Sequence, residues 1–178
     1  MMLVSQLDPR LEFSSVYDEH VDFVWSMVRR LGVAPSQLED AVQDVFVVAH
    51  RQLRKFRGES TIKTWVGGIA VRVAQEHRRQ RRRRDEWEPL DAHTQVPVDG
   101  GGPHEAAEAA QAWAKLERVL ETLDEDQRTV FVLANLEELS APDIARMVDA
   151  PLNTVYSRLR LARAKLVDAL QNLRRGEE

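Results

Sequence analysis

The side chains best suited to chemistry lie near the C-terminus, within residues 152–173. Asn153, Thr154, Ser157 and Arg160 share one face of a predicted helix. An apolar stripe at helical spacing marks the other face: Val155, Leu159, Ala162, Leu166, Leu170 and Leu173. Short polar side chains reach base edges in the major groove of DNA, and arginines beside them meet phosphates. The chemistry indicated is therefore recognition of a DNA sequence.

A shorter helix just before this stretch is expected to position it. Ser140 is a suitable N-cap, with Asp143 as its capping-box partner, and Ile144 gives the helix an apolar side. Pro151 stands at the start of the second helix, where its missing N–H costs nothing. Two helices joined by a tight corner form a helix-turn-helix. For this stretch alone, an ordinary helical hairpin with a solvated polar face is the alternative.

A second candidate surface lies on a helix predicted over residues 37–55, after a first helix over 11–31 that ends at Gly32. One side of the 37–55 helix is apolar: Leu38, Ala41, Val42, Val45 and Ala49. The other side carries Glu39, Asp40, Gln43, Asp44 and Val47. An apolar residue ringed by acids suits docking of a basic partner protein, although a solvated acidic face is more common on any single helix.

A third candidate surface is a dense run of arginines. A helix capped by Ser60 or Thr61 is expected to bury Ile62, Trp65, Val66, Ile69, Ala70 and Val73. It continues into residues 78–84, of which six of seven are Arg. Such a run is either a nucleic-acid contact or a solvated tail. Because it extends a helix with an apolar face, we favour nucleic acid.

The composition favours an all-α fold. Of 178 residues 43% are hydrophobic and only 6% aromatic, while Ala, Leu, Arg and Glu abound. The absence of cysteine excludes disulfides and thiolate zinc sites. The histidines are scattered and no glycine-rich phosphate loop is present, so we expect no enzyme activity, cofactor, metal or small-molecule substrate. No run reaches membrane-spanning length and no signal peptide is visible, so we expect a cytoplasmic protein.

Charge divides the chain into zones. Residues 1–84 carry fifteen Lys and Arg against ten Asp and Glu, whereas residues 85–110 carry seven acids and no Lys or Arg. Residues 85–108 also hold three of the seven Pro and three of the eight Gly, which predicts a flexible acidic linker. We therefore expect two small helical domains, 1–84 and 109–178. In the second, Trp113, Leu116, Val119, Leu120 and Leu123 form one helix, and Asp124 caps the next, whose inward residues are Gln127, Val130, Phe131 and Ala134.

Three motifs in this order resemble a known family. They are Leu38-Glu39-Asp40-Ala41-Val42-Gln43-Asp44-Val45-Phe46, then Phe56-Arg57-Gly58 with Lys63-Thr64-Trp65, then Thr154-Val155-Tyr156-Ser157-Arg158-Leu159-Arg160-Leu161-Ala162-Arg163. The chain is similar to bacterial RNA polymerase sigma factors of the extracytoplasmic-function (ECF, RpoE-like) group of the sigma-70 family. The resemblance covers residues 11–84 and 109–173. It implies a transcription initiation factor that binds core RNA polymerase and promoter DNA and is controlled by an anti-sigma factor.

The resemblance also implies roles for particular residues. Docking on the polymerase clamp would fall to Glu39, Asp40, Gln43, Asp44 and Val47. Recognition and melting of the −10 element would fall to Lys63, Trp65, Arg72, Glu76, His77, Arg78, Arg79, Arg81 and Arg82. Recognition of the −35 element would fall to Asn153, Thr154, Tyr156, Ser157, Arg158, Arg160, Leu161 and Arg163. The acidic linker would enter the polymerase towards the path of the RNA.

Four positions depart from the family pattern. Where this chain has Arg72 the family commonly has Asn, and where it has Glu76 the family commonly has Asp. At the position of Tyr156 a basic residue is frequent in the family, and at the position of Leu161 an Arg is frequent. Both promoter preferences are therefore expected to be particular to this chain. Two other functions remain open on the residues alone. A stand-alone transcriptional regulator would use only the helix-turn-helix and would bind a palindromic operator as a dimer. An Arg-rich RNA-binding adaptor would use only residues 78–84.

Overall fold

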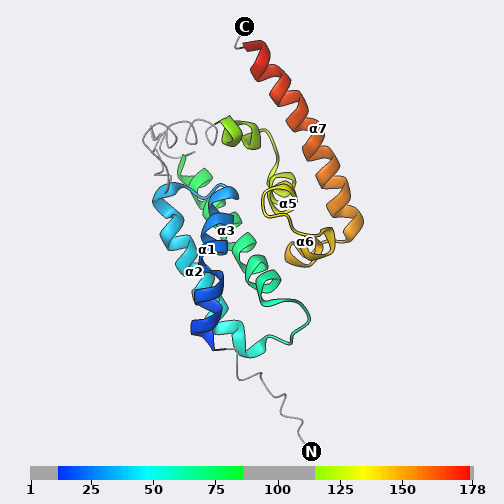
Figure 1. The fold of residues 1–178 in the computed structure, drawn as a ribbon. Helices are drawn as coiled ribbons and strands as arrows, with labels where there is room; N and C mark the ends of the chain where they lie inside the picture. The colour runs from blue at the N-terminus through cyan, green and yellow to red at the C-terminus, as the bar shows by residue number, and fades with distance from the viewer. Residues whose placement is uncertain (1–11, 86–114, 177–178) are drawn as a thin grey trace, which may run out of the picture. The chain divides into compact units, whose positions relative to one another are not determined.

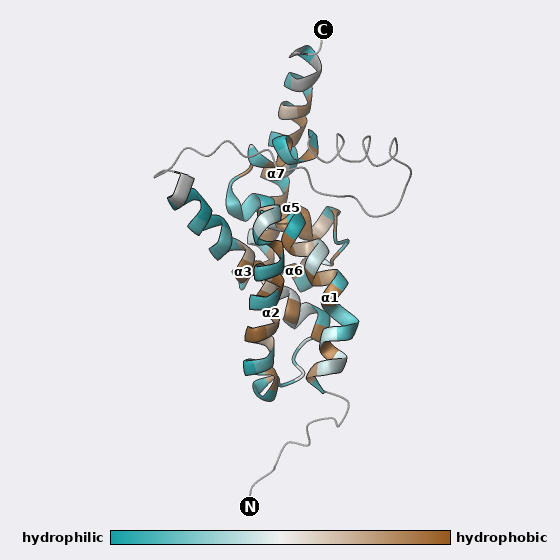
Figure 2. Cartoon of the chain, turned by 90° about the vertical axis from the view of Figure 1, so that its left-hand side faces the viewer, coloured by the Kyte–Doolittle hydropathy of each residue, from teal (hydrophilic) through white to brown (hydrophobic). Residues whose placement is uncertain are grey.

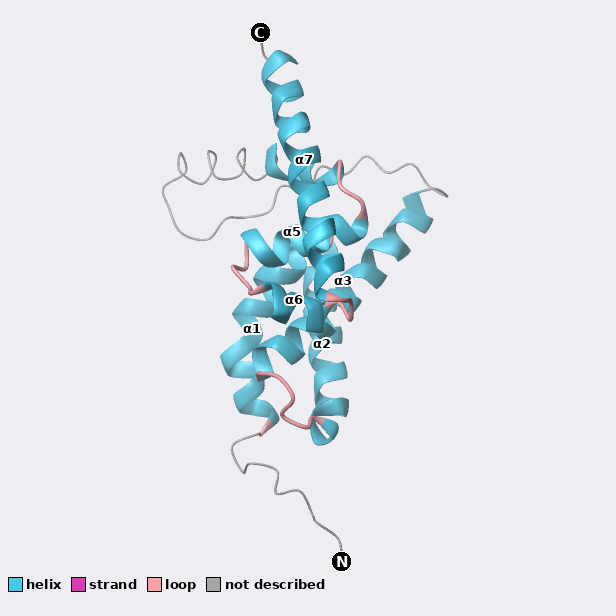
Figure 3. Cartoon of the chain, turned by 90° about the vertical axis from the view of Figure 1, so that its right-hand side faces the viewer, coloured by secondary structure: helices cyan, strands magenta, loops and turns pink. Residues whose placement is uncertain are grey.

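The computed structural model describes residues 12–85 and 115–176 (Figure 1). Within those residues the regular structure is helical throughout, and no strand is found in them (Figure 3). The chain divides into two compact units, the first built largely from α1, α2 and α3, the second from α5, α6 and α7. The all-α prediction is confirmed. The predicted linker lies outside the described residues except for Asp85.

The first unit follows the predicted helices closely. Its helices are α1 (Phe13–Arg30), α2 (Leu38–Gln52) and α3 (Ile62–Asp85), with short 3₁₀ turns η1 (Pro35–Gln37) and η2 (Leu53–Lys55) on either side of α2. Gly32 ends α1 with φ of 90°, a left-handed conformation that glycine adopts without steric cost. Residues 53–55, expected to belong to the second helix, form the separate turn η2 instead.

The core of the first unit comes from one face of each helix. The predicted stripe of α2 is buried in full, together with Phe46. In α1 the buried residues are Val16, Val24, Met27 and Val28, and in α3 they include Val66, Ile69 and Ala70. Tyr17 on α1 is 41% exposed, and its ring lies against that of Phe46 with the centroids 4.6 Å apart. Ile62, Trp65 and Val73 are only half-buried.

The second unit contains helical residues 115–121, followed by α5 (Glu125–Asn135), α6 (Ala141–Met147) and α7 (Leu152–Gly176). Asp124 caps α5 as predicted, since its Oδ1 accepts a hydrogen bond from the Gln127 backbone N–H at 2.8 Å. Val130 is buried, but Phe131 and Ala134 are half-buried, and Val132 and Leu133 are buried in addition. Trp113 lies outside the described residues.

The predicted helix-turn-helix is α6, a corner and α7. The Asp143 backbone N–H donates to Ser140 Oγ at 3.3 Å, and the Ser140 hydroxyl donates to the Asp143 carboxylate. The cap is therefore confirmed, although the reciprocal bond uses the hydroxyl rather than the backbone. Asp149 turns the corner with φ of 50°, which short polar side chains tolerate.

The apolar stripe of α7 is confirmed only in its first half. Val155, Leu159, Ala162 and Leu166 are buried, but Leu170 is 50% exposed, which corrects the prediction. The side chain of Leu173 lies outside the described residues. Leu170 is exposed because α7 is much longer than α5, the helix on which it packs. At 1.5 Å per residue, the 11 residues of α5 span about 16 Å and the 25 residues of α7 span about 37 Å.

Among the described residues, none of the helices combines the length and the hydropathy that a membrane span requires.

Candidate nucleic-acid interface and docking face

The acidic face is our name for Glu39, Asp40, Gln43, Asp44 and Val47 on α2. All five side chains are exposed, and Val47 is 38% exposed among the acids, as the sequence predicted. Glu39 and Asp40 lie in the first turn of α2, where the partial positive charge of the helix N-terminus stabilises carboxylates. Two carboxylates of the acidic face therefore stabilise the N-terminus of α2, and the whole face offers a surface on which a basic partner could dock.

One residue of the acidic face also contacts α3. His77 Nε2 lies 2.9 Å from Asp44 Oδ2, which is hydrogen-bonding distance across 33 residues of sequence. The His77 side chain is 12% exposed and that of Asp44 is 60% exposed. The two residues belong to different predicted sites, polymerase docking and the −10 element. The structure brings these two predicted surfaces into direct contact.

The first turn of α3 is held by three local contacts. Thr61 caps the helix, because its Oγ1 accepts a hydrogen bond from the Thr64 backbone N–H at 3.1 Å. Lys63 Nζ lies 4.6 Å from the centroid of the Phe23 ring on α1, a cation–π arrangement. Trp65 packs on Phe56 from the preceding loop, with centroids 5.2 Å apart. The predicted −10 residues at this end are thus placed by packing.

The remaining predicted −10 residues follow along α3. Exposed positions are Arg72, Glu76, Arg79, Arg81 and Arg82, and Arg78 is half-buried. Since α3 runs unbroken from Ile62 to Asp85, the arginine run continues a helix that is anchored in the core. Figure 2 shows this C-terminal half of α3 predominantly in the hydrophilic colour. A cationic rod of this kind is suited to the phosphates of a nucleic acid.

The predicted −35 residues divide into two groups on α7. Asn153, Tyr156, Ser157, Arg160 and Leu161 are exposed, with Tyr156 at 54% and Leu161 at 44%. Exposed polar groups with two apolar neighbours are suited to base edges and thymine methyl groups in the major groove. Thr154 is half-buried at the start of the same helix.

The second group is engaged by α5. Arg158 forms an ion pair with Asp126, and Arg163 Nη2 donates to Asn135 Oδ1 at 3.2 Å. Lys165 Nζ lies 3.8 Å from Asp124 Oδ2. The sequence placed these cations on the flanks of the polar face but could not find their partners, because α5 and α7 meet only in the folded unit. The same cations thus orient α7 on α5.

No group of three or more His, Asp or Glu side chains that could hold a metal ion occurs within residues 12–85 and 115–176. Sequence reasoning assigned no contact to Arg51, Arg54 and Lys55, which are exposed at the end of α2 and in η2.

Comparison with known families accounts for both units. Residues 16–84 match the model of sigma-70 region 2, and residues 113–166 match that of sigma-70 region 4. The ECF RNA polymerase sigma-E factor of Haemophilus influenzae is 34% identical over 149 residues, covering 79% of this chain and 78% of the relative. The corresponding factor of Escherichia coli K12 is 33% identical, covering 84% and 82%. The chain belongs to the ECF family of RNA polymerase sigma factors.

Solved structures agree on the fold of this sigma factor. The sigma factor RpoE of Bartonella quintana, solved with the anti-sigma factor NepR, has a TM-score of 0.70 at 21% identity and covers 89% of this chain and 96% of its own. CnrH, solved with the cytosolic domain of CnrY, has a TM-score of 0.64 at 24% identity and covers 90% and 88%. Every residue that we assign to a candidate contact lies inside the segments matched by regions 2 and 4.

Proposed function

We propose that this chain is a transcription initiation factor that binds core RNA polymerase in the cytoplasm and directs it to promoters. The observation that carries the proposal is that an exposed acidic face, an anchored cationic helix and a helix-turn-helix lie in order within one sigma-70 chain. The factor itself makes or breaks no bond, and the polymerase supplies the chemistry.

The acidic face is proposed to dock on a basic, helical surface of the largest polymerase subunit. Val47 offers a small apolar contact at the centre, and the carboxylates around it provide charge complementarity. Complementary charge mainly raises the association rate and fixes the register of the two proteins. The apolar centre contributes the part of the affinity that salt does not screen.

The helix α3 is proposed to bind the −10 element and to stabilise its separated strand. Strand opening requires that bases leave the stack and find another partner, while cations hold the backbone. Trp65 and Lys63 lie at one end of α3, and the arginine run supplies cations at the other. The exposed Arg72, where the family commonly has Asn, is expected to change which −10 sequence is preferred.

The exposed face of α7 is proposed to read the −35 element as duplex. Asn153, Ser157 and Arg160 are positioned to hydrogen-bond base edges, and Tyr156 and Leu161 add apolar contacts. Each unit alone is small, so its affinity for DNA is expected to be low. Binding of both units to one polymerase raises the effective concentration of the second contact once the first has formed.

Control by an anti-sigma factor forms part of the proposal. Two structures with the same fold were solved as complexes, one with the anti-sigma factor NepR and one with the cytosolic domain of CnrY. A protein that covers the acidic face or occludes α7 would prevent promoter recognition by competition. Such a partner need only bind the free factor more tightly than the polymerase does.

The proposal is tested by run-off transcription with reconstituted holoenzyme and a library of promoter fragments. We expect discrete start sites that are absent with core polymerase alone. In a parallel pull-down, Asp40→Arg with Asp44→Arg is expected to abolish co-purification with core polymerase. Asp18→Arg with Asp22→Arg on α1 is the matched control, because both pairs are exposed, four residues apart on a helix and changed by the same charge.

Retention of polymerase by the α2 variant, or its equal loss in the α1 variant, would remove the docking role. The stand-alone regulator makes a different prediction. In that case the purified chain would bind an inverted repeat as a dimer, without polymerase, and the run-off reactions would show no dependence on it.

A further inference from the structure

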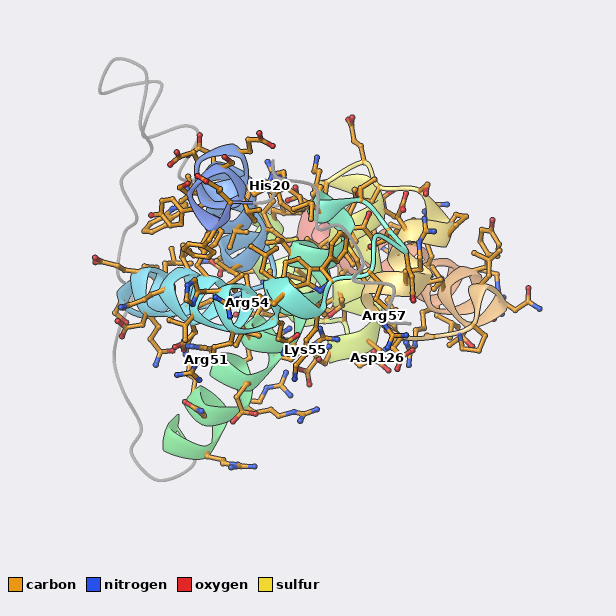
Figure 4. All side chains as sticks on the ribbon, turned by 90° about the horizontal axis from the view of Figure 1, so that it is seen from below. His20, Arg51, Arg54, Lys55, Arg57 and Asp126 are labelled. Atoms are coloured by element: carbon orange, nitrogen blue, oxygen red, sulfur yellow. The ribbon has the colours of Figure 1, made fainter. Side chains whose placement is uncertain are left out.

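Three cations on the flanks of the exposed face of α7 are held by α5: Arg158, Arg163 and Lys165. Arg158 pairs with the carboxylate of Asp126, which Figure 4 labels on α5. Lys165 pairs with the carboxylate of Asp124. Arg163 differs, because its Nη2 donates to the neutral amide oxygen of Asn135 at 3.2 Å. Of these three cations, Arg163 is therefore the one whose partner on α5 cancels none of its positive charge.

Both polar groups of the Asn135 side chain are used in this contact. Its Nδ2 donates to the Phe131 backbone carbonyl at 3.1 Å, and its Oδ1 accepts from Arg163. A carbonyl oxygen can only accept and a guanidinium can only donate, so the two neighbours fix the orientation of the amide. A carboxylate at position 135 would repel the Phe131 carbonyl and cancel part of the charge of Arg163. An amide is thus the group that holds Arg163 and leaves it fully charged.

Folding stability alone does not explain the contact between Asn135 and Arg163. Both side chains are exposed, so water competes for their hydrogen bonds and the net contribution to stability is small. The C-terminal end of α5 attracts a cation through its partial negative charge, but that attraction does not need the Asn135 side chain. The packing of α7 comes instead from buried residues such as Val155 and Ala162. The hydrogen bond therefore orients Arg163 more than it stabilises the unit.

Arg163 lies beside the face of α7 that is proposed to read DNA. Successive residues of an α-helix are about 100° apart, so Arg163 lies about 60° around the helix axis from Arg160. By the same geometry Arg158 and Lys165 lie about 160° and 140° from Arg160. Arg163 is thus the flanking cation nearest to Arg160. A helix in the major groove has phosphates on either side of its base-reading face, and Arg163 is placed to meet one of them.

We propose that Asn135 is a positioning residue for DNA binding, which holds Arg163 within reach of a backbone phosphate beside the −35 element. The inference rests on the proposed function of α7. A guanidinium has five N–H donors, so Arg163 can keep its bond to Asn135 and donate to a phosphate at the same time. An Arg side chain that is already ordered also loses less conformational entropy when it binds.

The experiment uses reconstituted holoenzyme and a promoter fragment found by run-off transcription, with a second fragment in which the −35 element is scrambled. Affinity is measured by fluorescence anisotropy over a series of KCl concentrations. N135D retains the size and one oxygen of the side chain but adds a charge, N135A removes both polar groups, and R163Q removes the cation. The matched control is N172D, which adds the same charge at an exposed Asn of α7 that has no assigned role.

On the intact promoter, R163Q should reduce the slope of log K against log salt by about 0.9, the value for one phosphate of duplex DNA. N135D should lower the slope towards that of R163Q, because the new carboxylate cancels the charge of Arg163. N135A should keep the wild-type slope but lower the affinity about two- to ten-fold, because Arg163 must then be ordered on binding. N172D should match wild type, and urea unfolding should give N135A the wild-type midpoint.

The double variant N135D/R163Q shows whether Asn135 acts through Arg163. Its slope should equal that of R163Q. An added loss as large as that of N135D in wild type would mean direct repulsion of DNA by the carboxylate, and would overturn the inference. Wild-type slopes for R163Q or N135D would also overturn it, as would a lowered unfolding midpoint of N135A that accounts for its loss of affinity.

Failure of the proposed function would look different in the same experiment. If wild-type holoenzyme bound the intact and the scrambled promoter equally well, α7 would not read a −35 element at all. The positioning role of Asn135 fails, by contrast, when wild type prefers the intact promoter but the variants at position 135 behave like N172D.

Discussion

The hydrogen bond between His77 and Asp44 makes a quantitative prediction, because it joins α2 and α3 where two proposed surfaces meet. The perturbation is a double-mutant cycle of Asp44→Ala, His77→Ala and both together in the full chain. The cycle isolates the energy of the pair, provided that each single change removes the contact without creating a new one.

The geometry sets the expected size. The His77 Nε2 to Asp44 Oδ2 distance of 2.9 Å is that of a good hydrogen bond, but the Asp44 side chain is 60% exposed, so water screens the pair. We expect a coupling energy of about 0.5–1 kcal/mol. The destabilisation by His77→Ala alone should differ from the coupling energy for two opposing reasons. The substitution loses the packing of a side chain that is 12% exposed, which destabilises the fold. It also removes a buried Nδ1 that has no hydrogen-bond partner, which stabilises the fold. The cycle cancels both of those effects.

The assay is urea unfolding followed by circular dichroism at one fixed pH. The control cycle replaces Asp44→Ala with Asp40→Ala, since Asp40 lies one turn earlier on the same exposed face and forms no ion pair or hydrogen bond among the described residues. The control coupling should be zero within about 0.3 kcal/mol. A coupling of the same size in both cycles, or none in either, would refute the reasoning.

Four further predictions concern individual side chains. Asp124→Ala should destabilise the second unit by about 1 kcal/mol in urea unfolding, and Asp124→Asn, which retains the capping oxygen, should destabilise it less. Thr61→Val should destabilise the first unit in the same assay, because it removes the cap of α3. Arg160→Ala should weaken −35 binding by holoenzyme by about 1–3 kcal/mol with unchanged stability, whereas Arg158→Ala should also lower stability by about 0.2–1 kcal/mol because it loses its partner on α5. Leu170→Gln should change the unfolding free energy by less than about 0.5 kcal/mol, because the side chain is half exposed.

The sequence predicted which helices exist and which face of each is buried, because a period of 3.6 residues leaves a readable stripe. It also predicted the caps at Asp124 and Ser140, since capping depends on residues three positions apart. It could not predict the contact of Asp44 with His77, because that contact depends on how two helices pack. Leu170 shows a second limit: periodicity tells which side of α7 is apolar but not that α5 ends long before α7 does.

The two proposed contacts of the first unit meet at α3, through the hydrogen bond between His77 and Asp44. The same helix carries core residues such as Ile69, the Asp44 contact through His77 and the cations offered to DNA. A change at a buried position would therefore shift α2 and the −10 surface together and would reduce polymerase docking and DNA binding at once. A change at exposed Arg72 should affect DNA binding alone. Loss of both activities by a surface variant of α3, with stability unchanged, would mean that docking and promoter recognition are coupled through the helix and are not independent surfaces.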